Sequence, residues 1–223
     1  LALLHTQLGD LGRPLLNSLM LAGGGALVTL TLAAAIASAA RRANSLGKAA
    51  GFAAGIGYAA PGAVIAVGAL ALFGLAREAG LVGGIGATLA IGALLWTYAA
   101  RFAAAGVQPI DAGLARLSKG IDSAARTLGA GPWRRFVQID LPIAAPSLAA
   151  AALILFVEIL KELPATLILR PFDFDTLAVK AHAYASDERL LQAAAPSLLI
   201  FAAGLAPILL LSRGMTGSRI GAS

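Results

Sequence analysis

Three charged residues stand close together in an otherwise apolar segment of the sequence, Ile143–Leu169. Glu158, Lys161 and Glu162 are spaced at i, i+3 and i+4, so they share one face of a helix. A lone charge near the middle of a membrane span costs about 2.5–3.5 kcal/mol, so we expect this face to turn away from lipid. The three residues, with Pro164 bending the outer end of the helix, would line a translocation path. The alternative interpretation is a structural Lys–Glu pair that locks two helices together. The two interpretations do not exclude each other.

A second candidate site is the polar stretch Gln108–Pro142, which lies between two apolar runs. Apolar residues recur in its first part every three or four positions, which predicts a short amphipathic helix. Gly129 stands where a helix C-cap glycine would, and Pro132 stands where the next helix would begin. Such a corner predicts docking to a soluble partner, although Trp133 and the nearby arginines also fit a helix lying on lipid headgroups. The residues expected to meet the partner are Ser123, Ala124, Ala125, Arg126, Leu128, Gly129, Trp133, Ile139, Leu141 and Pro142.

The sequence lacks the residue patterns of several kinds of catalysis. No G-x-x-x-x-G-K-[ST] phosphate loop, H-E-x-x-H zinc motif or G-x-S-x-G nucleophile motif occurs. His5 and His182 are too far apart for a zinc or catalytic site, and there is no cysteine for a disulfide or thiolate site. The acidic residues of Arg170–Arg189 have no recognisable ligand spacing, so this segment is a lid, a docking surface or a plain loop. We therefore expect no enzyme activity, no metal and no cofactor.

Membrane-spanning helices must position both candidate sites. The 223 residues are 59% hydrophobic and 13% charged, with a mean hydropathy of +0.84, whereas soluble domains are about 25% charged. Five runs reach the roughly 20 residues that cross a bilayer, and lipid forces each of them to be helical. We predict an all-α membrane protein, with Pro61 kinking its second span. The expected division is a linker at 1–14, a transmembrane domain at 15–213 with spans at 15–40, 49–76, 79–101, 143–169 and 190–212, a loop at 108–142, and a tail at 214–223.

The basic residues predict how the spans are oriented. If the first span starts outside, eleven Lys and Arg residues lie on the inside and five on the outside, as the positive-inside rule requires. The net charge of +6 therefore indicates topology and does not indicate nucleic-acid binding. Five spans put the N-terminus outside and the C-terminus in the cytoplasm. The residues counted as inside are Arg41, Arg42, Lys48, Arg101, Arg116, Lys119, Arg126, Arg134, Arg135, Arg213 and Arg219.

The polar corner resembles the cytoplasmic signature of binding-protein-dependent ABC importer permeases. In that signature E-A-A is followed by three residues, a glycine, nine residues and I-x-L-P. The chain keeps this spacing at Ala124, Ala125, Gly129, Ile139, Leu141 and Pro142, and Ser123 takes the place of the glutamate. A second stretch, from Lys161 through Pro171 to Glu188, is similar to the second half of iron(III)-type permeases, whose two six-helix halves are fused. The chain would be the last five spans of such a C-terminal half, which would explain its start at Leu1.

The resemblance implies a type I permease core in a bacterial inner membrane. Its loop would dock as a coupling loop on a cytoplasmic ABC ATPase, and an extracytoplasmic solute-binding protein would deliver the solute. A second permease half and membrane lipid would be its other partners. Ferric iron is the leading substrate, while permeases for thiamine, sulfate, polyamines and phosphonates share the loop. Two other classes remain open: an ion-coupled secondary transporter, in which the three charged residues relay protons, and a membrane scaffold.

Overall fold

The computed structural model describes residues 10–41, 45–80, 86–115, 120, 125 and 127–217. These residues form helices and turns, with no strand among them. Four of the described helices are long and apolar enough to cross a membrane, and a strongly bent pair makes a fifth candidate span. The predicted all-helical membrane fold is confirmed. The elements are α2 (Gly12–Arg41), α3 (Ser45–Ala59), α4 (Gly62–Glu78), α5 (Ala87–Leu114), α7 (Pro132–Arg135), the π-helical η1 (Phe136–Asp140), α8 (Leu141–Leu160), α9 (Pro164–Leu169), α10 (Leu177–Ser186) and α11 (Leu190–Gly217).

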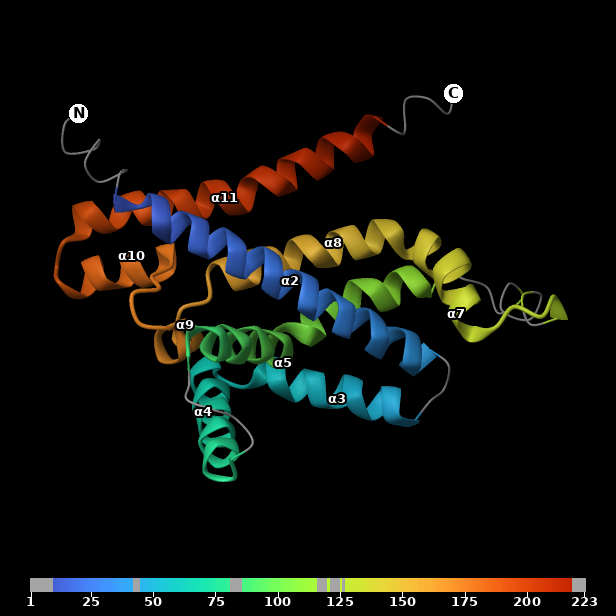
Figure 1. The fold of residues 1–223 in the computed structure, drawn as a ribbon. Coiled ribbons are helices and arrows are strands. Elements are labelled where there is room, and N and C mark those ends of the chain that lie inside the picture. The colour runs from blue at the N-terminus through green and yellow to red at the C-terminus, as the bar shows by residue number, and fades with distance from the viewer. Residues whose placement is uncertain are drawn as a thin grey trace.

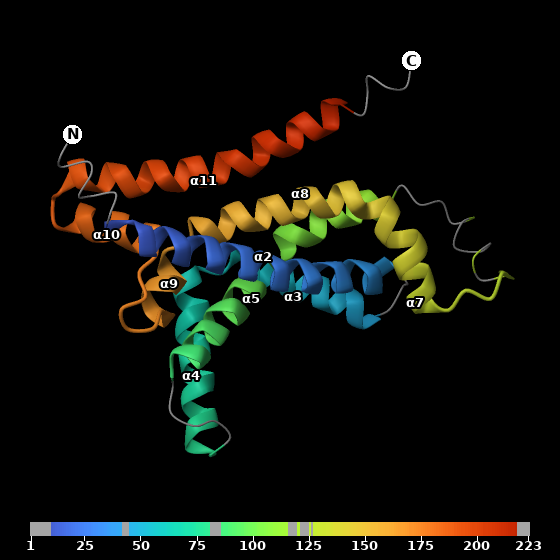
Figure 2. The ribbon, with the colours of Figure 1, turned by 45° about the horizontal axis from the view of Figure 1, so that its top comes forward.

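Helices α2, α5 and α8 pack most extensively against one another and form the centre of the bundle (Figure 1). Small residues allow their backbones to approach closely: a Cβ on Gly106 would lie only 2.9 Å from the Cβ of Ala33. The fully buried side chains at this centre include Leu94, Tyr98 and Leu155. Helix α11, in contrast, diverges from α8 towards its C-terminal end in both views (Figure 2), and its span is only 11% buried. Its apolar surface is therefore left to lipid or to another subunit.

The second expected span, 49–76, is two helices in the structure. Helix α3 ends at Ala59 and α4 begins at Gly62, and the two axes are bent by 114°. Pro61, with φ −58°, has no N–H for the helical ladder, and its carbonyl accepts the N–H groups of Val64 and Ile65 to begin α4. The proline therefore causes a break far sharper than the expected kink, and α4 projects sideways from the bundle (Figures 1 and 2).

The third expected span, 79–101, also differs from the helix that forms. Helix α5 begins at Ala87 and continues past Arg101 to Leu114, 28 residues in all. Arg101, which was expected at the cytoplasmic end of the third span, thus stands in the middle of a helix that is long and apolar enough to cross a membrane. The helix continues because a charge from another segment meets Arg101 inside the bundle, as described below. Without Arg101 the basic residues still divide ten to five between the two sides.

The chain continues from the short helix α7 into α8 without an intervening loop, although a loop was expected up to residue 142. The π-helical segment η1 joins the two helices. Pro142 has no N–H to donate to the carbonyl of Gln138, which removes the usual i→i−4 bond at this point. A single π-helical turn accommodates such an interruption. The fourth expected span, 143–169, instead breaks near Lys161, between α8 and α9.

Gly57 provides a test of the packing between α3 and α5. A Cβ on Gly57 would lie 2.2 Å from the carbonyl oxygen of Ala100, whereas nothing lies within 4 Å of a Cβ on Gly55. Gly57→Ala should therefore destabilise the protein by about 1–3 kcal/mol through overpacking. Gly55→Ala should be neutral or slightly stabilising, because alanine favours a helix. Thermal unfolding of the two variants in detergent measures the difference, and equal melting temperatures would contradict the packing.

Candidate functional site

The break between α8 and α9 is organised around Glu162, whose side chain is only 6% exposed. Pro164 begins α9 and cannot donate a backbone hydrogen bond, so α8 stops before it. The Glu162 carboxylate accepts the N–H of Ala165 at 3.1 Å, and the Glu162 carbonyl accepts the Thr166 hydroxyl at 2.8 Å. The Thr166 hydroxyl oxygen in turn accepts the buried Tyr98 hydroxyl at 2.7 Å. Glu162 thus caps the new helix and ties it to α5.

The same carboxylate faces Arg101 of α5. Glu162 Oε1 lies 3.6 Å from Arg101 Nη1, and the guanidinium carbon lies 5.2 Å from the ring centroid of Phe102. Gly62, the first residue of α4, makes the approach possible. A Cβ on Gly62 would lie 1.8 Å from Arg101 Nη1 and 2.7 Å from Glu162 Oε1. The structure therefore brings the α3–α4 break, the α8–α9 break and the middle of α5 together at one ion pair.

The three charged residues expected to share one helix face are divided between two contacts. Lys161 Nζ lies 2.8 Å from Glu158 Oε1, and their side chains are 55% and 25% exposed. Glu162, in contrast, is buried against α5, because the helix ends before it can keep the i, i+4 register. Pro164 is exposed at the start of α9. The Lys161–Glu158 pair joins residues three apart at the end of α8, so it is not the expected Lys–Glu pair between two helices, and the Arg101 contact was not foreseen.

The helix corner has the backbone geometry of a glycine-capped helix end. Gly129 has φ +73°, and the N–H of Ala130 donates to the carbonyl of Ala125 at 3.0 Å. This six-to-one bond is the mark of a Schellman motif, and α7 then begins at Pro132, as predicted. Ser123, Ala124 and Arg126 lie outside the described residues.

The described residues of the expected docking surface are not all on the exterior. Leu128 is 83% exposed and Trp133 75% exposed, while Leu141 is 39% exposed, and Gly129 and Pro142 also face the exterior. Ala125 is 5% exposed, and Ile139 packs against a buried cluster of α2, α5 and α8 residues. The expected docking residues therefore fall into two groups. One group is exposed, and the other, Ala125 and Ile139, is packed inside the protein.

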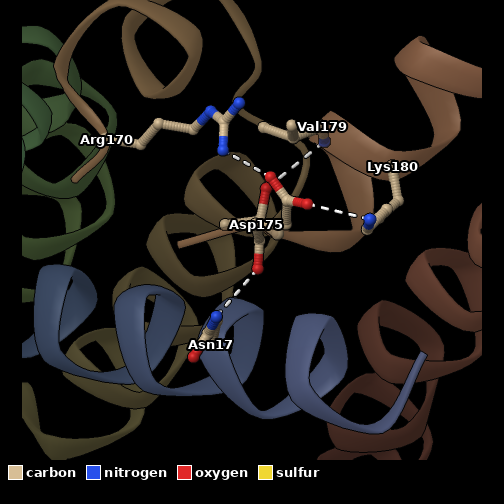
Figure 3. A network of polar contacts seen from close by, with 6 residues as sticks. Asn17, Arg170, Asp175, Val179 and Lys180 are labelled. Atoms are coloured by element: carbon tan, nitrogen blue, oxygen red, sulfur yellow. Dashed lines mark hydrogen bonds and ion pairs between the residues drawn. The ribbon is translucent and has the colours of Figure 1, made fainter. Parts of the chain in front are cut away.

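A polar network holds the opposite end of the bundle together, centred on Asp175 (Figure 3). The Asp175 carboxylate contacts Arg170, and its second oxygen lies 2.9 Å from Lys180 Nζ of α10. Asn17 of α2 donates to the Asp175 carbonyl at 2.9 Å, and Ser18 of α2 accepts the N–H of Leu177 at 2.8 Å. These contacts clamp the start of α10 onto α2. The segment 170–189, which the sequence left as a lid, docking surface or loop, therefore contains a docked helix.

Sequence reasoning missed Arg101, Gly62 and Tyr98 as parts of the central site. A signal for Arg101 was present: apolar residues continue on both sides of it, from Ala87 to Val107. A charge inside such a run indicates a partner within the bundle. No comparable signal existed for Gly62 and Tyr98, because their role depends on contacts with distant segments. Among the described residues, no group of three or more His, Cys, Asp or Glu side chains could hold a metal ion.

Comparison with known proteins identifies the relatives of this chain. No family model matches it. It is 32% identical over 104 residues to the Fe(3+)-transport system permease protein FbpB 2 of Haemophilus influenzae, a match that covers 47% of this chain and 21% of that protein. It is 30% identical over 104 residues to the 2-aminoethylphosphonate transport system permease protein PhnV of Salmonella typhimurium, covering 47% of this chain and 39% of that protein. These matches span less than half the length of either relative.

A third relative is also named as a transport permease, and a solved structure of an ABC transporter has a similar fold. The molybdate/tungstate transport system permease protein WtpB of Thermococcus kodakarensis is 39% identical over 57 residues, which are 26% of this chain and 23% of that protein. The fold is similar to a chain of a bacterial ABC transporter involved in the import of the acidic polysaccharide alginate. That similarity has a TM-score of 0.71 at 16% identity, over 90% of this chain and 77% of the other. The resemblance to ABC importer permeases predicted from the corner is confirmed, as is the fold.

Asp175→Asn tests the clamp on α10. Its carboxylate raises the pKa of Lys180 above its ordinary value of 10.5, mainly through their hydrogen bond. The stabilisation that comes from the raised pKa of Lys180 is therefore present at neutral pH and is lost as the pH rises through that elevated pKa. The substitution should make the backbone amides of α10 exchange several-fold faster at pH 7, because partly exposed ion pairs contribute up to about 1 kcal/mol each.

Asp173→Asn is the matched control for this experiment. Asp173 lies in the same segment at φ +58°, a conformation that asparagine also accepts. Hydrogen exchange followed by mass spectrometry reads both variants. Equal exchange of residues 177–186 in the two variants would contradict the clamp.

Proposed function

We propose that this chain is the membrane permease part of an ATP-driven ABC importer in a bacterial inner membrane. In this proposal it moves a small solute by alternating access and performs no catalysis itself. Its corner docks on a cytoplasmic ATPase, and the α10 end meets an extracytoplasmic solute-binding protein. A second permease half completes the path, and the N-terminus lies outside while the C-terminus is cytoplasmic. The observation that supports the proposal best is the Schellman corner, which presents Leu128 and Trp133 beyond the packed helices.

The geometry of the corner suits the transmission of force. Helix α7 continues through η1 into α8, so a displacement at Trp133 would pass along a helical connection to the bundle centre. Ile139, which is packed against the α2–α5–α8 cluster, would anchor that connection. A nucleotide shifts a conformational equilibrium only if it favours one of the two states. We assign that bias to the ATPase, and the two broken helix pairs to the part of the permease that changes.

Ferric iron is the substrate that we propose to test first. The iron-system permease of Haemophilus matches over as many residues as the phosphonate-system permease of Salmonella, at slightly higher identity. The equal match is 21% of the first protein and 39% of the second, so the first is nearly twice as long, which suits two fused halves. We propose that this chain is one such half. Phosphonate, molybdate, sulfate, thiamine and polyamines are the alternative solutes.

ATP-dependent uptake tests the proposal. The full polypeptide should be reconstituted into proteoliposomes with its ATPase and its binding protein, and supplied with radiolabelled ferric iron, phosphonate or molybdate. We expect uptake to require ATP on the side of the vesicle that the ATPase faces. A protonophore should not affect this uptake. Uptake that is driven by a proton or sodium gradient without ATP would instead indicate a secondary transporter. Absence of uptake together with absence of an ATPase complex would leave the scaffold as the remaining class.

Gly129→Val should prevent stable association with the ATPase. A β-branched residue at φ +73° costs about 1–2 kcal/mol and should distort the corner. Gly131→Val is the matched control, because neither position has a neighbour within 4 Å of a Cβ and Gly131 does not have a positive φ. Co-purification with the ATPase reads the result, and membrane insertion checks folding. Equal association of the two variants would remove the corner from the docking site.

A further inference from the structure

Arg101 lies where the two interrupted helix pairs meet, in the middle of the membrane helix α5. Gly62, which begins α4, lies against its Nη1 atom, and Glu162, which follows the end of α8, faces the same atom. A charged side chain within a membrane span is costly, and such residues generally face a cavity or a partner. Interrupted helices are likewise found at membrane depth where they line a path or are buried in protein. Two interruptions that converge on one guanidinium therefore indicate a functional position.

The ion pair leaves the guanidinium with unused hydrogen-bonding capacity. The Nη1 atom is buried, yet it has no hydrogen-bond partner among the described residues. Its distance of 3.6 Å from Glu162 Oε1 is too long for a hydrogen bond. Glu162 Oε1 instead accepts the N–H of Ala165. A pair built only to lock two helices would be expected to form direct hydrogen bonds, because burying the charges costs several kcal/mol for each ion.

The backbone N–H groups at the N-terminus of α4 are a second set of hydrogen-bond donors beside the guanidinium. No side chain caps the N-terminus of α4, and the Gly62 backbone lies against Arg101 Nη1. The Arg101 side chain is 22% exposed, and Glu162 only 6%. The arginine is therefore the more accessible member of the pair, and a guanidinium is well shaped for binding the oxygens of carboxylates and phosphates.

We infer that Arg101 binds anionic oxygens of the transported solute, and that Glu162 holds the guanidinium when no solute is present. This inference rests on the proposed transport function and identifies a residue of the path. The oxygens would belong either to a free oxyanion or to an anion that coordinates ferric iron. Relatives named for phosphonate and molybdate transport are consistent with the first source. Solute oxygens replace Glu162 at the guanidinium, and Glu162 keeps its bond to Ala165.

Exchanging the two charges separates solute binding from helix locking. The double variant Arg101→Glu with Glu162→Arg retains an ion pair between α5 and the α8–α9 break but moves the positive charge to the other side. We expect co-purification with the ATPase at the wild-type level, and uptake below about one tenth of wild type, because hydrogen bonds to charged groups typically contribute at least tenfold in affinity. Uptake restored to the wild-type rate would overturn the inference and leave the pair as a lock.

If the double variant does not form a complex with the ATPase, the single variant Arg101→Lys tests whether Arg101 binds the solute. Lysine keeps the charge but loses the planar fork of donors. We expect the KM for uptake to rise about tenfold or more, while ATP hydrolysis by the complex stays close to wild type. An unchanged KM would overturn the inference. Arg77→Lys is the matched control, because it makes the same substitution at an exposed residue near the end of α4.

The choice of labelled probe identifies the source of the oxygens. Molybdate and 2-aminoethylphosphonate test a free oxyanion, and radiolabelled ferric iron with and without citrate tests a coordinating anion. A KM defect of Arg101→Lys for either kind of probe supports the inference. Equal KM values of variant and wild type for every transported probe overturn it. If the wild-type complex takes up nothing with ATP, the proposed function itself has failed, which is a different result.

Discussion

A guanidinium inside an apolar bundle needs an opposite charge within reach, and the arrangement of the helices follows from meeting that need for Arg101. Glu162 reaches it only because α8 ends at Leu160 and the chain restarts as α9. The backbone of α4 reaches it only because Pro61 ends α3 and Gly62 has no side chain. Tyr98 and Thr166 then hold the restarted helix against α5. The interruptions in two spans are therefore parts of one charged centre, and not separate defects.

The two ends of the bundle are connected to this centre in different ways. At one end the corner at Gly129 leads through α7 and η1 into α8, which carries the Glu162 break at its far end. At the other end Asp175 clamps α10 to α2, a short distance along the chain from α9. Figure 1 places these two ends at opposite extremes of the long axis. The corner is thus connected to the charged centre through consecutive helices, and polar contacts hold the other end to α2.

The sequence predicted the features that depend on local chemistry. Gly129 was expected to cap a helix and does, because a positive φ favours glycine wherever the rest of the chain lies. Pro61 was expected to kink one span and Pro164 to bend another for the same kind of reason, and the structure breaks the chain at both places. The pairing of Arg101 with Glu162 joins residues far apart in sequence, so a rule that reads charges as span boundaries ended α5 too early. Thr176 caps α10 locally, but the N–H of Leu177 also donates to Ser18, some 160 residues earlier, and no local pattern reveals that contact.

We propose, above all, that a cytoplasmic ATPase binds the helix corner at Gly129. The sequence contains no cysteine, so a single cysteine introduced at Leu128 or at Leu191 can carry a photo-activated crosslinker without a background signal. The two leucines are 83% and 89% exposed; Leu128 precedes α7 and Leu191 follows α10, and these two helices lie at opposite ends of the bundle (Figure 2). In membranes that are actively importing solute, we predict crosslinking to the ATPase from position 128 and none from position 191. No crosslink from position 128, or equal crosslinking from both, would contradict the account.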